Sequence, residues 1–492
     1  MTWRARIARL KTWVPLLSTA LLFNLAFPPI NFGLLALVAL APWLAWLRDA
    51  SPKQAWRSGF ALGALIYAVQ MIWLLPLVTK WTGSAALSLV PWVLAAAIGG
   101  FFYLWVGLAG RWCMAQRKEW LFPFLYAGME AIRASLPGLA FPYALISTPL
   151  WPYPVLTQNA FLGTQYLVSA WVVAVSVLGA MLLLNEKWHR GRALMLGAGL
   201  FVALSATLMG RELPGKPRTL VAGQLGADIA FGDMNERTRA VNAVEAIVEA
   251  AKYNQADLVV LPEGLVDGGG RLPPTTPFRL PEGVSVVFGG RRGSGPVYQS
   301  AFARSASGEW SFADKSRLVV FGEYVPGRDW LPFLDQFKLP SGDLVAADKV
   351  SALQVGDLKV GPLLCFEAMF WDVAHAQTQN GAQVLAVMCL DDWYFGTPAP
   401  DQLRAAAVWR AVETGLPVVR SAPLGYTMIV DGKGEVVTEA PTRLQTPIKA
   451  SVAVPDAPAK NPFRPVFPWA AGLLWPAWGV YLLGARMRQN RA

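Results

Sequence analysis

The sequence predicts a polytopic α-helical membrane domain of about eight spans joined to a layered α/β domain. Three observations favour this fold class. Of the 492 residues, 54% are hydrophobic and 15% are charged, whereas a water-soluble protein carries about 25% charged residues. Much of the apolar excess lies in long uncharged runs, as in transmembrane helices. Residues 216–456 instead alternate helical patterns with short apolar runs, which include 219–224, 257–261, 284–289, 359–366, 383–388 and 417–421. This alternation is typical of an α/β domain.

Eight apolar stretches define the predicted spans. We expect them at residues 13–28, 30–47, 58–78, 84–110, 120–134, 165–185, 193–210 and 466–485. The predicted domains are therefore a seven-helix transmembrane domain over 1–212, an α/β domain over 216–456 and a C-terminal transmembrane helix over 466–485.

The distribution of basic residues predicts the orientation. Sixteen Lys or Arg flank the spans on one side, and only Lys80 lies in the alternate loops. The positive-inside rule then places both termini in the cytoplasm and the α/β domain outside it. Residues 211–464 hold 25 basic and 28 acidic side chains. The net charge of +11 therefore comes from the membrane part, and it gives no argument for nucleic-acid binding.

The fifth predicted span contains two charged residues, Glu130 and Arg133, one helical turn apart. Charges within a bilayer are usually paired or functional, so these two form either a structural ion pair or a substrate contact. Residues 135–164 follow without any charge and are rich in Pro and aromatic residues. We expect this segment either to lie at the outer membrane interface or to pack between spans five and six.

Three short strings in the α/β domain contain candidate catalytic residues. LVVLPEG places Glu263 after an apolar strand, FADKSRLVVFGEYVP contains Lys315 and Glu323, and GPLLCFE places Cys365 at a strand end with Glu367 two residues on. Singly, these are ordinary caps, surface charges or core residues. Together, at strand ends where α/β sheets place reactive groups, they supply a nucleophile, a cation and a base.

The positions of the histidines and cysteines argue against several kinds of active site. His189 and His375 are far apart, and Cys113, Cys365 and Cys389 include no Cys-x-x-Cys pair. A zinc site, a haem attachment and a Cys-His couple are therefore not expected, and we predict no metal and no cofactor. A nearby ammonium and carboxylate can still make a thiol reactive. Of the three cysteines, only Cys365 lies in one of the strings above; Cys113 lies at a helix end and Cys389 ends a different strand.

The strings PEG, DKSRLVVFGEYVP and CFE, in this order and spacing, resemble the Glu-Lys-Cys triad of the nitrilase superfamily. The seven spans, this domain and the last span together resemble the apolipoprotein N-acyltransferases, bacterial enzymes that add the third acyl chain to lipoproteins. The resemblance implies a four-layer αββα sandwich. It also implies that Cys365 is the nucleophile, Glu263 the general base and Lys315 the oxyanion-stabilising cation, with Glu323 and Glu367 as supporting active-site carboxylates.

The same resemblance implies the substrates and the location. The acyl donor would be a phospholipid, expected to be phosphatidylethanolamine, and the intermediate a thioester. The acceptor would be the diacylglyceryl-cysteine at the N-terminus of an apolipoprotein. The protein would be a multi-pass protein of the bacterial inner membrane with a periplasmic catalytic domain.

The chain departs from the family around the triad. CLDDWYFG, residues 389–396, stands where the family has a string like SNDAWFG, so Asp391 takes an asparagine position. Two alternatives therefore stay open. One is a divergent nitrilase-like membrane acyltransferase or amidase of the TraB-like group associated with conjugal transfer. The other is a non-catalytic scaffold that retains the fold.

The charge asymmetry predicts how topology reporters behave. A reporter fused after Arg211 should behave as exported, and one fused at the C-terminus as cytoplasmic, because basic loops are retained inside. Reporter activity in whole cells measures this. A cytoplasmic signal from a fusion at residue 300 would place the α/β domain on the wrong side of the membrane.

Overall fold

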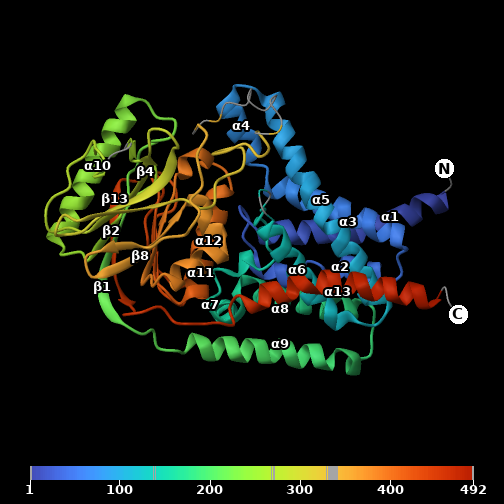
Figure 1. Ribbon diagram of the computed structural model, residues 1–492. Coiled ribbons are helices and arrows are strands. Elements are labelled where there is room, and N and C mark those ends of the chain that lie inside the picture. The colour runs from blue at the N-terminus through green and yellow to red at the C-terminus, as the bar shows by residue number, and fades with distance from the viewer. Residues whose placement is uncertain are drawn as a thin grey trace. The chain divides into compact units, whose positions relative to one another are not determined.

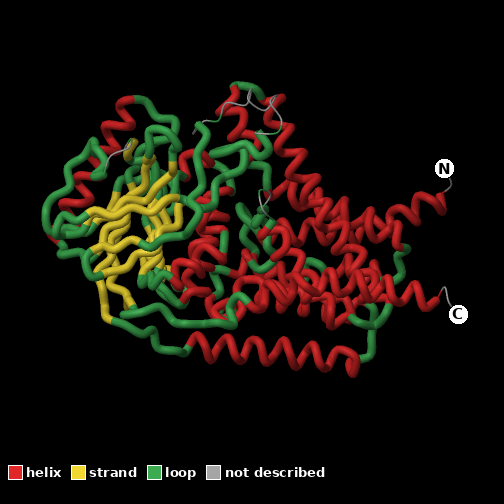
Figure 2. Tube along the Cα trace, in the orientation of Figure 1, coloured by secondary structure: helices red, strands yellow, loops and turns green. Residues whose placement is uncertain are grey.

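The computed structural model describes residues 3–136, 138, 140–267, 269, 272–328, 330, 339 and 342–489. The chain divides into two compact units (Figure 1), of which one is Met1–Gly210 with Pro462–Ala492 and the other is Arg211–Asn461. Among the described residues, the first unit is helical and all the strands lie in the second (Figure 2).

The first unit contains ten α-helices among its described residues. They are α1 (Trp3–Ala26), α2 (Ala41–Leu47), α3 (Pro52–Gln70), α4 (Leu74–Thr82), α5 (Ala85–Ala115), α6 (Phe122–Ser135), α7 (Pro154–Thr157), α8 (Ala160–Leu183), α9 (Trp188–Met209) and α13 (Val466–Gln489). Short 3-10 helices occupy Gly33–Leu37, Glu119–Leu121 and Thr148–Leu150.

Four of the described helices are long and apolar enough to cross a membrane: Ala85–Ala115, Ala160–Leu183, Gly191–Met209 and Val466–Arg488. A fifth candidate is the pair of α3 and α4, which are bent by 57°. The sequence predicted one continuous span here. Pro76, in the first turn of α4, has no N–H with which to continue a preceding helix. The predicted spans at 13–28 and 30–47 correspond to the shorter apolar helices Trp13–Ala26 and Gly33–Leu47. The predicted span at 120–134 corresponds to α6, which has 14 residues.

Helices α3 and α5 pack closely through glycines. A Cβ atom at Gly63 of α3 would lie 2.4 Å from the carbonyl oxygen of Gly99 in α5 and 2.6 Å from Cβ of Tyr103. Small residues allow two apolar helices to approach closely. Such close packing drives helix association in a bilayer, where lipid tails are as apolar as the helices and the hydrophobic effect gives no driving force. Gly63 therefore determines the distance between these helices.

Glu130 and Arg133 on α6 do not bind each other in the structure, so the ion pair considered above is not observed. Glu130 accepts a hydrogen bond of 2.8 Å from the N–H of Ile146, and Arg133 donates one of 2.5 Å to the carbonyl of Tyr143. Both side chains are buried. These two side chains therefore hold the irregular segment after α6 by its backbone. They satisfy a backbone N–H and a backbone carbonyl to which lipid could not hydrogen-bond.

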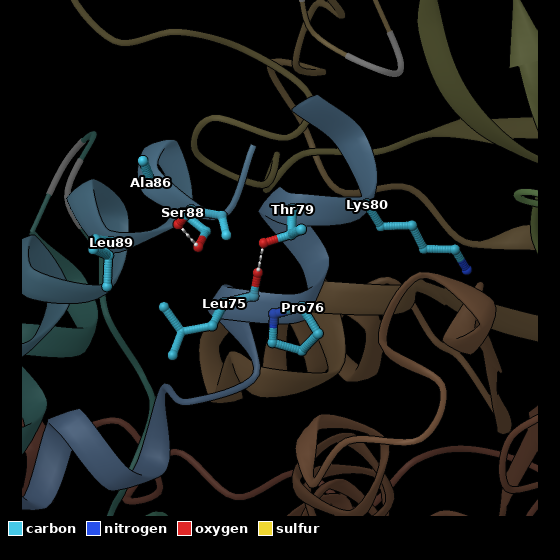
Figure 3. A pocket seen from close by; sticks show the side chains of 8 residues that line it. Leu75, Pro76, Thr79, Lys80, Ala86, Ser88 and Leu89 are labelled. Carbon is cyan, nitrogen blue, oxygen red and sulfur yellow. Dashed lines mark hydrogen bonds between the residues drawn. The ribbon is translucent and has the colours of Figure 1, made fainter. Parts of the chain in front are cut away.

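A hollow of about 650 Å³ lies along α4 and α5 (Figure 3). The hydroxyl of Thr79 donates to the carbonyl of Leu75 and that of Ser88 to the carbonyl of Ala85, at 2.8 and 2.7 Å. The lining is otherwise mostly apolar, and Lys80 points away from the other labelled side chains. None of the predicted catalytic residues lines this hollow.

The second unit is built on two sheets. The first has the order β13-β1-β2-β4-β5-β6, with β3 paired to β4. Its strands are β1 (Lys216–Gln224), β2 (Leu258–Val260), β3 (Val266–Asp267), β4 (Val286–Arg292), β5 (Tyr298–Arg304), β6 (Trp310–Asp314) and β13 (Thr446–Val454). The second has the order β12-β11-β10-β9-β8-β7, formed by β7 (Leu353–Val355), β8 (Leu358–Leu364), β9 (Val384–Met388), β10 (Val418–Ser421), β11 (Met428–Val430) and β12 (Val436–Glu439).

The two sheets share one apolar core, to which β2 contributes Val260 and β8 contributes Leu364. Helix α10 (Met234–Tyr253) covers the first sheet with an apolar face that includes Val244 and Ile247. Helices α11 (Trp371–Gln379) and α12 (Ala399–Thr414) contact β8 and β10 of the second sheet. The unit is thus a four-layer αββα sandwich (Figure 1).

The close approach of α3 and α5 predicts a large effect of one small substitution. Gly63→Val should destabilise the protein by about 1–3 kcal/mol, because the added carbons have no space. Gly197→Val on α9 is the matched control, since nothing lies within 4 Å of its Cβ position. The apparent Tm of the detergent-solubilised protein measures both. Equal Tm values for the two variants would show that the helix contact is not tight.

Candidate active site

The predicted catalytic residues lie at strand ends in both sheets. Glu263 comes shortly after β2, Lys315 directly follows β6, and Cys365 directly follows β8. Strands β1, β2 and β4 run parallel to one another, as do β8, β9 and β10. Parallel strands bring their carboxyl ends to one edge of a sheet, where α/β proteins bind their substrates.

The ammonium group of Lys315 lies among carboxylates. Its Nζ donates a hydrogen bond of 2.7 Å to Oε1 of Glu323 and lies 3.6 Å from Oε1 of Glu263. The second oxygen of Glu323 accepts a hydrogen bond of 2.9 Å from the N–H of Val319. Lys315 also interacts electrostatically with Cys365. The structure therefore brings Glu263, Glu323 and Cys365 together around the buried ammonium of Lys315.

Burial strengthens the interactions among Lys315, Glu263 and Glu323, because charges attract more strongly where water is excluded. Burial alone would lower the pKa of Lys315, but the carboxylates of Glu263 and Glu323 outweigh it and raise that pKa, so the ammonium form is retained. Burial raises the pKa of Glu263 to about 7, and the attraction of Lys315 only partly opposes this rise. A carboxylate with a pKa near neutral pH is suited to general base catalysis.

Glu367, the fifth predicted residue, holds two segments of the site together. Its Oε1 accepts hydrogen bonds from the N–H and the hydroxyl of Ser316, both at 2.8 Å, and from the N–H of Arg317 at 3.1 Å. Its Oε2 accepts from the N–H of Leu364 at 3.0 Å. Glu367 thereby joins the segment after Lys315 to the residue before Cys365.

The backbone at two positions shapes the site. Cys365 has a φ of 50° and begins the 3-10 helix Cys365–Met369 directly after β8. A left-handed conformation is uncommon for a residue with a side chain and is found at strained functional positions. On β4, a Cβ atom at Gly289 would lie 2.7 Å from Cα of Glu263. Only glycine leaves room there for the segment that holds Glu263.

The structure also contains a buried ion pair that the sequence analysis missed. Arg420, in β10, donates to both carboxylate oxygens of Asp391, at 2.8 and 2.9 Å, and both side chains are fully buried. Burial would lower the pKa of Arg420, but Asp391 raises it. Gly425 leaves room for this carboxylate, since a Cβ atom there would lie 1.9 Å from it. The available signal was an arginine in the apolar strand PVVRS, because a buried charge requires a partner.

Cys389 is not as separate from Cys365 as the sequence analysis expected. It directly follows β9, which is the direct neighbour of β8 in the sheet, and its side chain interacts electrostatically with that of Cys365. Within the residues that the structure describes, no group of three or more His, Cys, Asp or Glu side chains could hold a metal ion.

Comparisons with known families agree with this architecture. Residues 19–178 match the family model described as the apolipoprotein N-acyltransferase N-terminal domain, and residues 280–457 match the carbon-nitrogen hydrolase family model. The second match includes Lys315 and Cys365, and Glu263 precedes it.

Related proteins align over nearly the whole chain. An apolipoprotein N-acyltransferase of Geobacter metallireducens is 26% identical over 485 residues, which cover 92% of this chain and 91% of that protein. One from Allorhizobium ampelinum is 28% identical over 515 residues, 93% of each chain. The crystal structure of Saccharomyces cerevisiae Nit3, a member of branch 10 of the nitrilase superfamily, aligns with a TM-score of 0.37 and 18% identity, over 49% of this chain and 92% of that one. Given both family matches and alignments of this extent, the chain belongs to the apolipoprotein N-acyltransferase family.

Proposed function

We propose that this apolipoprotein N-acyltransferase uses Cys365 as its nucleophile, Glu263 as general base and Lys315 as the cation that stabilises negative charge. The observation that carries the proposal is the buried ammonium of Lys315, which interacts with the thiol of Cys365 and lies 3.6 Å from the carboxylate of Glu263. A nucleophile, a base and a fixed positive charge are the groups that acyl transfer requires.

In the first step Glu263 accepts the thiol proton, and the thiolate of Cys365 attacks the ester carbonyl of a phospholipid acyl chain. The resulting oxyanion is stabilised by Lys315 and by the backbone N–H that follows the cysteine. When the carbon–oxygen bond breaks, Glu263 returns the proton to the leaving lysophospholipid. The acyl chain remains on Cys365 as a thioester.

In the second step the free α-amine of a diacylglyceryl-cysteine attacks the thioester. Glu263 accepts a proton from the amine, the carbon–sulfur bond breaks, and the proton returns to the thiolate. The products are an amide at the apolipoprotein N-terminus and a free Cys365. The same three groups therefore serve both half-reactions, with Glu323 holding Lys315 and Glu367 holding the segments on either side.

The helical unit matches these lipid substrates. Removing an acyl chain from a bilayer costs about 0.8 kcal/mol per methylene, so a membrane-embedded enzyme avoids a cost that a soluble one would meet. We further propose phosphatidylethanolamine as the donor, and eight membrane passages in which shorter or broken helices supplement the long ones. The excess of basic residues on the side of the two termini supports cytoplasmic termini and a periplasmic catalytic domain.

The thioester predicts how the cysteines differ. After incubation with phospholipid labelled in its acyl chains, the wild type should retain a hydroxylamine-sensitive label, and Cys365→Ser should retain none and lose turnover. Cys113→Ser is the matched control, since that thiol is buried in α5; it should keep both label and turnover.

Two results would contradict the assignment. Thioester label on Cys365→Ser would move the nucleophile to another residue. A folded wild type that acquires no label and acylates no lipoprotein would favour the scaffold alternative. Complementation of a strain depleted of its own N-acyltransferase distinguishes the second case from a failed reconstitution.

A further inference from the structure

The two cysteines of the α/β domain directly follow the ends of adjacent strands. Strands β8 and β9 are parallel, and Leu364 is paired with Met388 at the end of their register. Cys365 and Cys389 are the next residue of each strand. Neighbouring strands are about 4.8 Å apart, within the range of Cα separations that a disulfide bridges.

The two side chains also interact. Cys389 interacts electrostatically with Cys365, and both cysteines are free. Cys365 is 6% exposed and Cys389 is fully buried. A small oxidant therefore reaches Cys365 first, and Cys389 is the thiol nearest to the product.

Burial makes Cys389 the less reactive thiol of the pair, because peroxides oxidise the thiolate form of a cysteine. Burial keeps the pKa of Cys389 well above its ordinary value, so that residue remains a thiol.

We propose that Cys389 is a resolving cysteine, which converts the oxidised nucleophile into a reversible Cys365–Cys389 disulfide. The proposal rests on the proposed function in one respect, namely that Cys365 is the reactive thiol. The disulfide would stop acyl transfer while it persists, and it would protect Cys365 from irreversible oxidation. The orientation proposed above places the pair outside the cytoplasm, where disulfides are stable.

The chemistry proceeds in two balanced steps with hydrogen peroxide as the oxidant. The thiolate of Cys365 attacks the peroxide, its sulfur gains one oxygen, the O–O bond breaks, and hydroxide leaves. The thiol of Cys389 then attacks the sulfenic sulfur, the S–O bond breaks, and the hydroxyl leaves with the Cys389 proton as water. The two sulfurs together lose two electrons, and an external dithiol returns them.

The test uses the full-length protein in detergent, treated with hydrogen peroxide and then denatured in the presence of a maleimide. In the wild type, peptide mass spectrometry should find Cys365 joined to Cys389 and only Cys113 alkylated. Dithiothreitol should restore both thiols and most of the acyl transfer. The matched control Cys113→Ser should form the same disulfide.

Cys389→Ser and Cys389→Ala should behave differently from the wild type. Their Cys365 should acquire two or three oxygens, and dithiothreitol should restore less than about a tenth of each variant's own untreated activity, because sulfinic and sulfonic acids are not reduced by thiols. Recovery equal to that of the wild type would overturn the proposal, as would the absence of the joined peptide. A disulfide that forms without any loss of acyl transfer would instead contradict the assignment of Cys365 as nucleophile.

Discussion

The ammonium group of Lys315 is the one charge on which the rest of the candidate site depends. It is buried, it is hydrogen-bonded to Glu323, and it lies close enough to Glu263 and Cys365 to affect both. Two carboxylates share this single cation. Because Glu323 makes the closer contact, Glu263 is incompletely compensated, and burial raises its pKa to about 7. A carboxylate with a pKa near neutral pH is suited to general base catalysis.

The sandwich fold brings these groups together from distant parts of the sequence. Glu263 and Lys315 come from one sheet and Cys365 from the other, and Glu367 joins the segments next to Lys315 and Cys365 through four hydrogen bonds. The sheets are held together by their shared apolar core. Substitutions in that core should therefore alter the positions of the site residues and not their chemical groups.

The sequence predicted the elements with strong local patterns better than those set by tertiary contacts. The apolar runs that became β1, β2, β4, β8, β9 and β10 were identified, because buried parallel strands are nearly continuous in hydrophobicity. The antiparallel β5 and β6 were missed, since their sequences contain polar and small residues that only their neighbours explain. The break between α3 and α4 was missed because hydropathy reports apolar length and not helix direction.

The five candidate residues were identified from short sequence strings, but the contacts and distances between them were not predicted. The arginine in PVVRS indicated that a buried charge needs a partner, but the sequence did not show that this partner is Asp391. It also did not show that Cys389 interacts with Cys365, because each partnership depends on which strands are adjacent. The pH dependence of thioester formation, compared between the wild type and Glu323→Gln, tests the account most directly. In the wild type the rate should rise with pH and level off above about 7, since Glu263 must lose its proton to act as a base. Removing the Glu323 charge should shift this rise to lower pH. The pKa of Glu263 should fall, because a neighbouring negative charge no longer raises it. A rise that stays in place or moves to higher pH would contradict the account.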